Sequence, residues 1–206
     1  MSETAETIKY KGHTIKIKYD TECGFSPRDN DNICVFHIAH SRYAFGDKHY
    51  NDRESIDEAE REALRNGDIV LPLYMYDHSG VTISLAPFSC PWDSGQVGFV
   101  QVPRKKMIEE FGGKIFTQRL KKIALKHAQG EVQEMDSYLT GEVYGYDIDD
   151  GDDSCWGFIG DIKYCIEEAK GAVDCIVKHN IKEHCKKLRQ WIENKVLLQY
   201  RKSLVI

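Results

Sequence analysis

Hydrophobic and polar residues alternate cleanly near the start of the chain. Apolar residues occupy every second position from Ile8 to Tyr19, apart from a break at Gly12 and His13, and lysines occupy the intervening positions. Side chains on a strand point alternately to two faces, so this pattern predicts two antiparallel strands that share one buried face. Residues 21–32 are mostly turn-forming and predict a long loop.

Further strands are predicted where short apolar runs are bounded by turn residues. They are expected at residues 33–39, 69–76, 81–88, 96–102, 142–148 and 154–159. The run at 33–39 is almost continuously apolar, which is typical of a central strand. The turns at 77–80 and 149–153 each join two of these runs into a hairpin.

Helical periodicity accounts for most of the remaining chain. Helices are expected at residues 55–66, 103–111, 116–127, 161–177 and from 181 onward, with a short helical turn at 135–139. His179 and Asn180 are expected to interrupt the last helical stretch. Strands and helices interleave without strict alternation, so we predict an α+β fold with a mainly antiparallel sheet built from hairpins, interleaved helices and a C-terminal amphipathic helical tail. Residues 1–160 are expected to form the α+β core domain, and residues 161–206 a helical extension packed on it.

The composition indicates a globular protein. The 206 residues are 41% apolar and 30% charged, and no apolar run approaches the ~20 residues that span a bilayer. The first residues lack the apolar segment of a secretory signal. Seven cysteines without close pairs are typical of free thiols and do not suggest structural zinc. We therefore expect a cytoplasmic protein with no cofactor and no metal.

Charged residues are sorted along the chain, although the net charge is only −5. Residues 131–168 contain twelve acids and a single base, whereas residues 104–126 and 178–202 are rich in lysine and arginine. Such patches steer charged partners through the local field rather than through the net charge. The candidate binding residues chosen on this basis are Asp149, Asp150, Asp152, Asp153, Lys182, Lys186 and Arg189.

The most unusual segment is the turn at 89–99, which reads SCPWDSGQVGF. A plain hairpin turn needs neither a tryptophan nor a cysteine, so the segment marks a candidate site. The candidate binding residues here are Trp92, Asp93 and Gln96. Cys90, His78 and Asp93 also offer the nucleophile, base and orienting carboxylate of a thiol enzyme. The alternative is structural: Cys90 and Trp92 close the end of the sheet, and Asp93 caps the turn.

Two metal sites are weighed against ordinary structural roles. The acids and histidines of residues 29–49 include His37 and His40, which strand alternation places on opposite faces. The aspartate run at 147–153 lacks the spacing and the closing glutamate of a calcium loop. The sequence therefore favours a core histidine in the first case and a solvated hairpin turn in the second.

Five segments carry a resemblance to known proteins. They are SPRDNDN (26–32), HSRYAFGDKH (40–49), LPLYMYDHSGVTISLAPFSCPWDSGQVGFV (71–100), LTGEVYGYDI (139–148) and DSCWGFIG (153–160). In that order they resemble a family of small proteins of bacteriophages and mobile elements, generally without an assigned activity. The resemblance covers roughly residues 19–160 and does not extend to the C-terminal tail. It implies an accessory role in the cytoplasm of a bacterial host, and it supplies no catalytic residues.

These observations together favour binding over catalysis. We expect a phage or mobile-element accessory protein that binds a macromolecule, and by analogy one that inhibits a host defence complex of the CRISPR or restriction type. The expected partner is a host protein or ribonucleoprotein complex, with nucleic acid contacts through the basic helices and a homo-oligomer as further possibilities, and no membrane. The alternatives are a cysteine-dependent hydrolase or transferase centred on Cys90, and a nucleic-acid-binding module that uses residues 104–126 and the tail.

Overall fold

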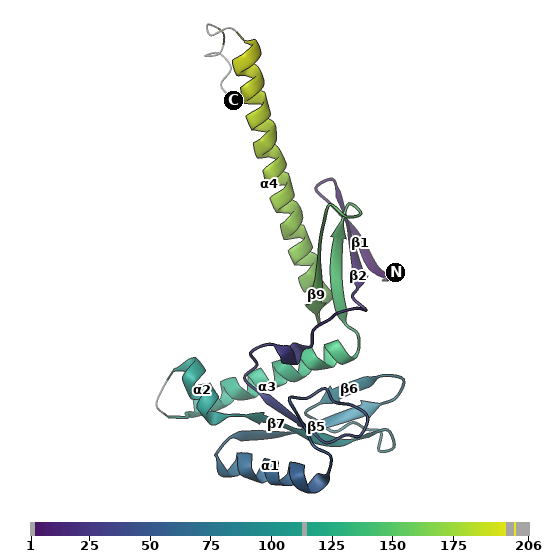
Figure 1. The fold of residues 1–206 in the computed structure, drawn as a ribbon, viewed down its shortest axis with the longest axis vertical. Coiled ribbons are helices and arrows are strands. Elements are labelled where there is room, and N and C mark those ends of the chain that lie inside the picture. The colour runs from purple at the N-terminus through teal and green to yellow at the C-terminus, as the bar shows by residue number, and fades with distance from the viewer. Residues whose placement is uncertain (1–2, 113–114, 197–199, 201–206) are drawn as a thin grey trace. The chain divides into compact units, whose positions relative to one another are not determined.

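The structure is a computed structural model that describes residues 3–112, 115–196 and 200. Within these residues it has nine strands and four α-helices, and the strands form two mostly antiparallel sheets (Figure 1). The α+β class is therefore confirmed, with its strands divided between two sheets. The contacts group the chain into two compact units, Met1–Tyr19 with Tyr144–Ile206 and Asp20–Val143. The domain boundary expected at residue 160 stays a prediction. The contacts group the last helix into one unit with the first two strands.

The first unit is a four-stranded antiparallel sheet covered on one face by a long helix. Its strands, in spatial order, are β1 (Thr4–Tyr10), β2 (His13–Tyr19), β8 (Val143–Ile148) and β9 (Asp153–Ile159). In the register of β2, Ile15 lies opposite both Ile8 of β1 and Ile148 of β8, so the apolar positions share one face. That face packs against Cys165, Ala169 and other apolar residues of α4 (Ile162–Lys195).

Helix α4 is one continuous element of 34 residues, so the predicted interruption at 179–180 is wrong. Its start is set by Asp161, whose carboxylate accepts a hydrogen bond of 2.9 Å from the Lys163 amide. Histidine and asparagine have a lower helix propensity than alanine by well under about 1 kcal/mol each, and only proline removes a backbone donor. Two such residues in the middle of a long helix therefore do not end it.

The second unit is a five-stranded sheet with helices on both faces. The spatial order of its strands is β4 (Lys48–His49), β3 (Val35–Ile38), β7 (Ser94–Val102), β5 (Ile69–Asp77) and β6 (Val81–Ser84), and only the β3–β4 pair is parallel. Helix α1 (Arg53–Arg65) packs on one face, and α2 (Arg104–Phe111) and α3 (Gln118–Leu139) on the other, as Figure 1 shows. The predicted hairpin of β5 and β6 and the helix at 55–66 are confirmed to within a few residues.

Helix α3 is longer than the sequence pattern suggested. It spans 22 residues, which include the region predicted as a separate turn at 135–139 and a glycine at position 130. Its buried positions Ala124, Ala128, Val132 and Met135 form one stripe against the sheet, and the burial of that stripe outweighs the ~1 kcal/mol cost of a helical glycine. Among the described helices, none combines the length and the apolar character that a membrane crossing requires.

Candidate functional site

The turn between β6 and β7 brings together three of the residues predicted as a site. The Asp77 amide donates to the Asp93 carbonyl at 2.9 Å, which holds the turn beside the end of β5. The Cys90 thiol then donates to Asp93 Oδ2 at 3.7 Å, and His78 Nδ1 lies 3.4 Å from the same oxygen. Cys90, His78 and Asp93 therefore do meet in space, and the thiol and the imidazole contact the same carboxylate oxygen.

This order of groups does not suit a cysteine nucleophile. In such a site the imidazole receives the thiol proton, and the carboxylate orients the imidazole from its far side. Here the thiol donates to the Asp93 carboxylate rather than to the imidazole, and the side chain of His78 is 63% exposed. The contacts of Asp93 match its structural role as the residue that holds the turn.

Trp92 at the tip of this turn does not close the end of the sheet. Its exposed fraction is 90%, more than that of any other large apolar side chain in the described residues. The third candidate of the segment, Gln96, donates from Nε2 to the Gly98 carbonyl of its own strand at 3.2 Å. The turn thus presents one uncovered tryptophan, a residue type enriched at the energetic centres of protein interfaces.

The acidic turn between β8 and β9 is largely neutralised by its neighbouring strand. Asp149 accepts from the Thr14 amide at 2.7 Å and lies 2.5 Å from His13 Nδ1, and these two groups hold the pKa of the Asp149 carboxyl below its usual range. Asp150 pairs with a lysine of β2, and Asp147 pairs with Lys18 at 2.6 Å. Asp150, Asp152 and Asp153 are all exposed at the turn, and Asp150 is the one of these three with an ion pair among the described residues.

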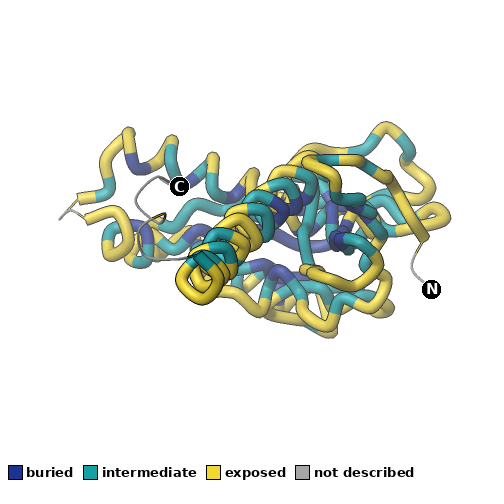
Figure 2. Tube along the Cα trace, turned by 90° about the horizontal axis from the view of Figure 1, so that it is seen from above, coloured by how far each residue is buried: buried dark blue, intermediate teal, exposed yellow. Residues whose placement is uncertain are grey.

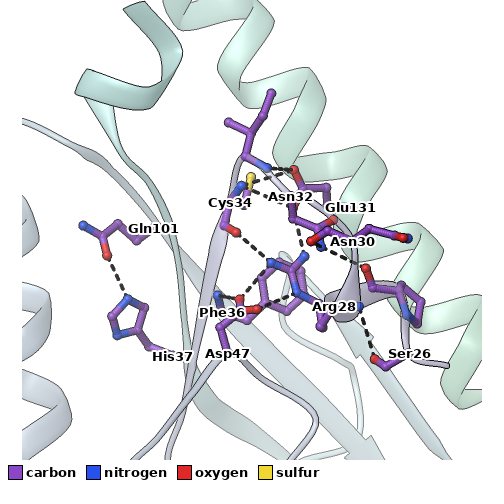
Figure 3. A network of polar contacts seen from close by, with 12 residues as sticks. Ser26, Arg28, Asn30, Asn32, Cys34, Phe36, His37, Asp47, Gln101 and Glu131 are labelled. Carbon is purple, nitrogen blue, oxygen red and sulfur yellow. Dashed lines mark hydrogen bonds and ion pairs between the residues drawn. The ribbon is translucent and has the colours of Figure 1, made fainter. Parts of the chain in front are cut away.

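Other acids of the 131–168 stretch are used inside the second unit. The clearest case is Glu131 of α3, which forms an ion pair of 2.9 Å with Arg28 and accepts from the Ile33 amide at 3.0 Å (Figure 3). Arg28, whose side chain is only 6% exposed, also pairs with Asp47 at 2.8 Å and donates to the Cys34 carbonyl. This network joins the loop before β3 to α3, so Glu131 holds the fold and is not part of an acidic surface.

His37 is a neutral histidine within a second buried network. Its Nε2 lies 2.8 Å from Gln101 Oε1, and its Nδ1 lies 2.9 Å from the Tyr50 hydroxyl. Gln101 donates from its amide nitrogen to Asp68, so its oxygen faces the ring, Nε2 carries the proton and Nδ1 accepts from Tyr50. Burial lowers the pKa of His37. Within the described residues, no group of three His, Cys, Asp or Glu side chains is arranged to hold a metal ion.

The distal half of α4, residues 178–195, contains no buried residue. The last buried residue of the helix is Val173, Ile176 and Val177 still pack on the core of the first unit, and beyond them Ile181 and Trp191 are 59% and 58% exposed. Figure 2 shows this part of the helix mostly in the colours of exposed and intermediate residues. The predicted contact residues Lys182, Lys186 and Arg189 all lie exposed on it. The amphipathic pattern indicated these bases. The sequence could not show that no apolar side chain between them is buried by another described element.

Comparison with known proteins adds no relative to this picture. No protein-family model matches the chain, and neither a curated protein nor a solved structure gives a significant match. The site must therefore be interpreted from its own geometry.

Proposed function

We propose that the protein acts by binding a macromolecule, and that the distal half of α4 is its main contact surface. The observation that supports this is the continuation of α4 beyond Val177, the last of its residues that packs on the core of the first unit. At 1.5 Å per residue this extension is roughly 27 Å long. A helix owes most of its stability in a protein to the packing of its apolar face, and no residue of this extension is buried.

The cost of leaving these side chains in water points to a partner. Covering an exposed Ile or Leu side chain contributes about 1.5–3 kcal/mol, and tryptophan and arginine are the residues most often found at the centres of interfaces. The distal half of α4 carries all of these residue types within three turns, at Ile181, Leu188, Arg189 and Trp191. Catalysis has less support, because the Cys90 thiol donates to the Asp93 carboxylate rather than to the His78 imidazole.

The biological setting is proposed from the resemblance to proteins of phages and mobile elements. In that setting the partner is a host protein or ribonucleoprotein complex in the bacterial cytoplasm, and binding inhibits a defence complex of the CRISPR or restriction type. The uncovered Trp92 in the other unit would be a second contact of the same kind.

The test compares two variants with equal changes of charge. The α4 variant carries Lys182→Glu, Lys186→Glu and Arg189→Glu, and the α3 variant carries the same reversal at three exposed lysines, Lys121, Lys122 and Lys126. Each variant, with its helix content checked by circular dichroism, is used as bait for affinity capture from the lysate of an infected bacterial host. We expect the α4 variant to lose the captured partner and the α3 variant to retain it. Capture that survives in the α4 variant, or that only the α3 variant loses, would refute the assignment of α4.

A further inference from the structure

The distal half of α4 carries its own apolar stripe. Ile181, Cys185, Leu188 and Ile192 recur at spacings of four, three and four, which places them on one side of a helix as in the seam of a coiled coil. We call these four residues the distal seam. Cys185, Leu188 and Ile192 are half-buried, and Ile181 is more exposed.

The distal seam does not continue the apolar face of α4 that packs on the sheet. The buried stripe of α4 consists of Cys165, Ala169 and Val173. At about 100° per residue, the centre of the distal seam lies roughly a third of a turn around the helix from the centre of that stripe. A wider sheet in the same place would therefore leave the seam uncovered, so the seam requires a separate partner surface.

The two flanks of the distal seam differ in charge. Lys178, Lys182, Lys186 and Arg189 follow one flank at spacings of four, four and three, and all four are exposed. The other flank carries His184, Trp191 and a single base, Lys195. Two acids lie near the basic row. Glu193 lies on the same flank one turn beyond Arg189, and Glu183 lies 3.9 Å from Lys186, where an exposed pair is worth at most about 1 kcal/mol. With four bases and one acid, the basic flank still carries a net positive charge.

These two properties together select one kind of occupant. We propose that the distal seam binds an amphipathic helix of a partner protein, with aliphatic residues against the seam and a row of glutamates or aspartates against the basic row. This inference rests on the proposed function, in which the distal half of α4 is the contact surface. Charge pairs beside a seam set the choice of partner in helix pairing.

Other occupants fit the surface less well. The distal half of α4 from a second copy brings another basic row, so pairing of the two distal halves adds repulsion beside the seam. Phosphates of a nucleic acid could meet the basic row but would leave Ile181, Leu188 and Ile192 in water. A helix lying on an anionic membrane has a broad charged face opposite its apolar face, whereas here four of the six bases of residues 178–195 lie on one flank of the seam.

The experiment uses two synthetic helical peptides as probes. Both have 21 residues with leucine and isoleucine at seam positions, and the flanking positions are all glutamate in one peptide and all lysine in the other. Each labelled peptide is titrated with the full-length protein, and binding is followed by fluorescence anisotropy. We expect the glutamate peptide to bind at least tenfold more tightly than the lysine peptide at low salt. The α4 variant should reverse this preference, the α3 variant should keep it, and Leu188→Asp should weaken both peptides at least tenfold.

Several results would overturn the inference. One is equal binding of the two peptides, and another is no binding of the glutamate peptide. A dimer of the free protein that Leu188→Asp dissociates in analytical ultracentrifugation would show that a second copy covers the seam. Tighter binding to single-stranded DNA or to phosphatidylglycerol vesicles than to the glutamate peptide would assign another occupant. If lysate capture depends on α4 while the glutamate peptide fails to bind, this inference fails and the proposed function stands; if capture is independent of α4, both fail.

Discussion

The buried network around Arg28 allows a quantitative test of the second unit. Replacing Arg28 with methionine keeps much of the side-chain volume but removes the guanidinium that pairs with Glu131 and Asp47. Breaking a buried ion pair from one side costs about 3–5 kcal/mol, because a charge is left without its partner. Glu131 keeps its hydrogen bonds from two backbone amides and Asp47 keeps that from Phe36, so we expect the lower end, about 3 kcal/mol.

The assay follows each unit through its own buried thiol. Cys34 lies in the second unit and Cys165 in the first, and burial raises the pKa of both, that of Cys165 to about 12. Both thiols should therefore react slowly until their unit unfolds. With a urea dependence of about 2 kcal/mol per M, Arg28→Met should lower the urea midpoint for labelling of Cys34 by about 1.5 M. The midpoint for Cys165 should stay unchanged.

A matched arginine at the surface provides the control. Arg42 lies 3.4 Å from Asp77, but its side chain is 72% exposed, and such pairs contribute about 0–1 kcal/mol. Arg42→Met should therefore move the Cys34 midpoint by less than about 0.5 M. If Arg28→Met shifts the midpoint no more than Arg42→Met, the network does not stabilise the fold as argued.

Three further predictions test other parts of the structure. Burial lowers the pKa of His37, so the unfolded chain binds the proton more readily than the folded protein. The contribution of His37 to the free energy of unfolding should be complete above about pH 6.5 and should fall below it by at most about 1.4 kcal/mol per pH unit. In urea titrations between about pH 6.5 and 5.5, the free energy of unfolding of His37→Gln should therefore depend less steeply on pH than that of the unchanged protein. Cys90 should react with iodoacetamide no faster than the exposed Cys155, as measured by peptide mass spectrometry. If Cys90 reacts tenfold faster than Cys155, and His78→Ala removes the difference, the enzyme alternative is restored. Gly98→Ala should destabilise the second unit by more than about 3 kcal/mol, because the new Cβ would lie 1.8 Å from the His37 carbonyl oxygen. Gly95→Ala should cost under about 1 kcal/mol, because no atom lies within 4 Å of its new Cβ. Equal urea midpoints for the two variants would refute this.

The candidate site was only partly accessible from the sequence. The amphipathic spacing after residue 180 indicated both the apolar stripe and the bases of the basic row, because helix periodicity is a local property. The acidic turn at 149–153 was predicted to contact a partner. Asp149 instead binds His13 and Thr14, which lie more than 130 residues earlier in the chain. Strand pairing of β2 with β8 creates this contact, and no local pattern specifies which strands become neighbours.

The sequence alone determined the elements whose signals are local. Alternation predicted the hairpin of β1 and β2, turn residues predicted that of β5 and β6, and helical periodicity predicted α1 to within a few residues. Only the tertiary structure decided that the strands form two sheets, that Glu131 of α3 is enclosed with Arg28, and that α4 continues past the last residue that packs on the core of its unit. The physical reason is that burial and charge pairing depend on which distant segments meet, whereas periodicity and turn chemistry depend on residues a few positions apart.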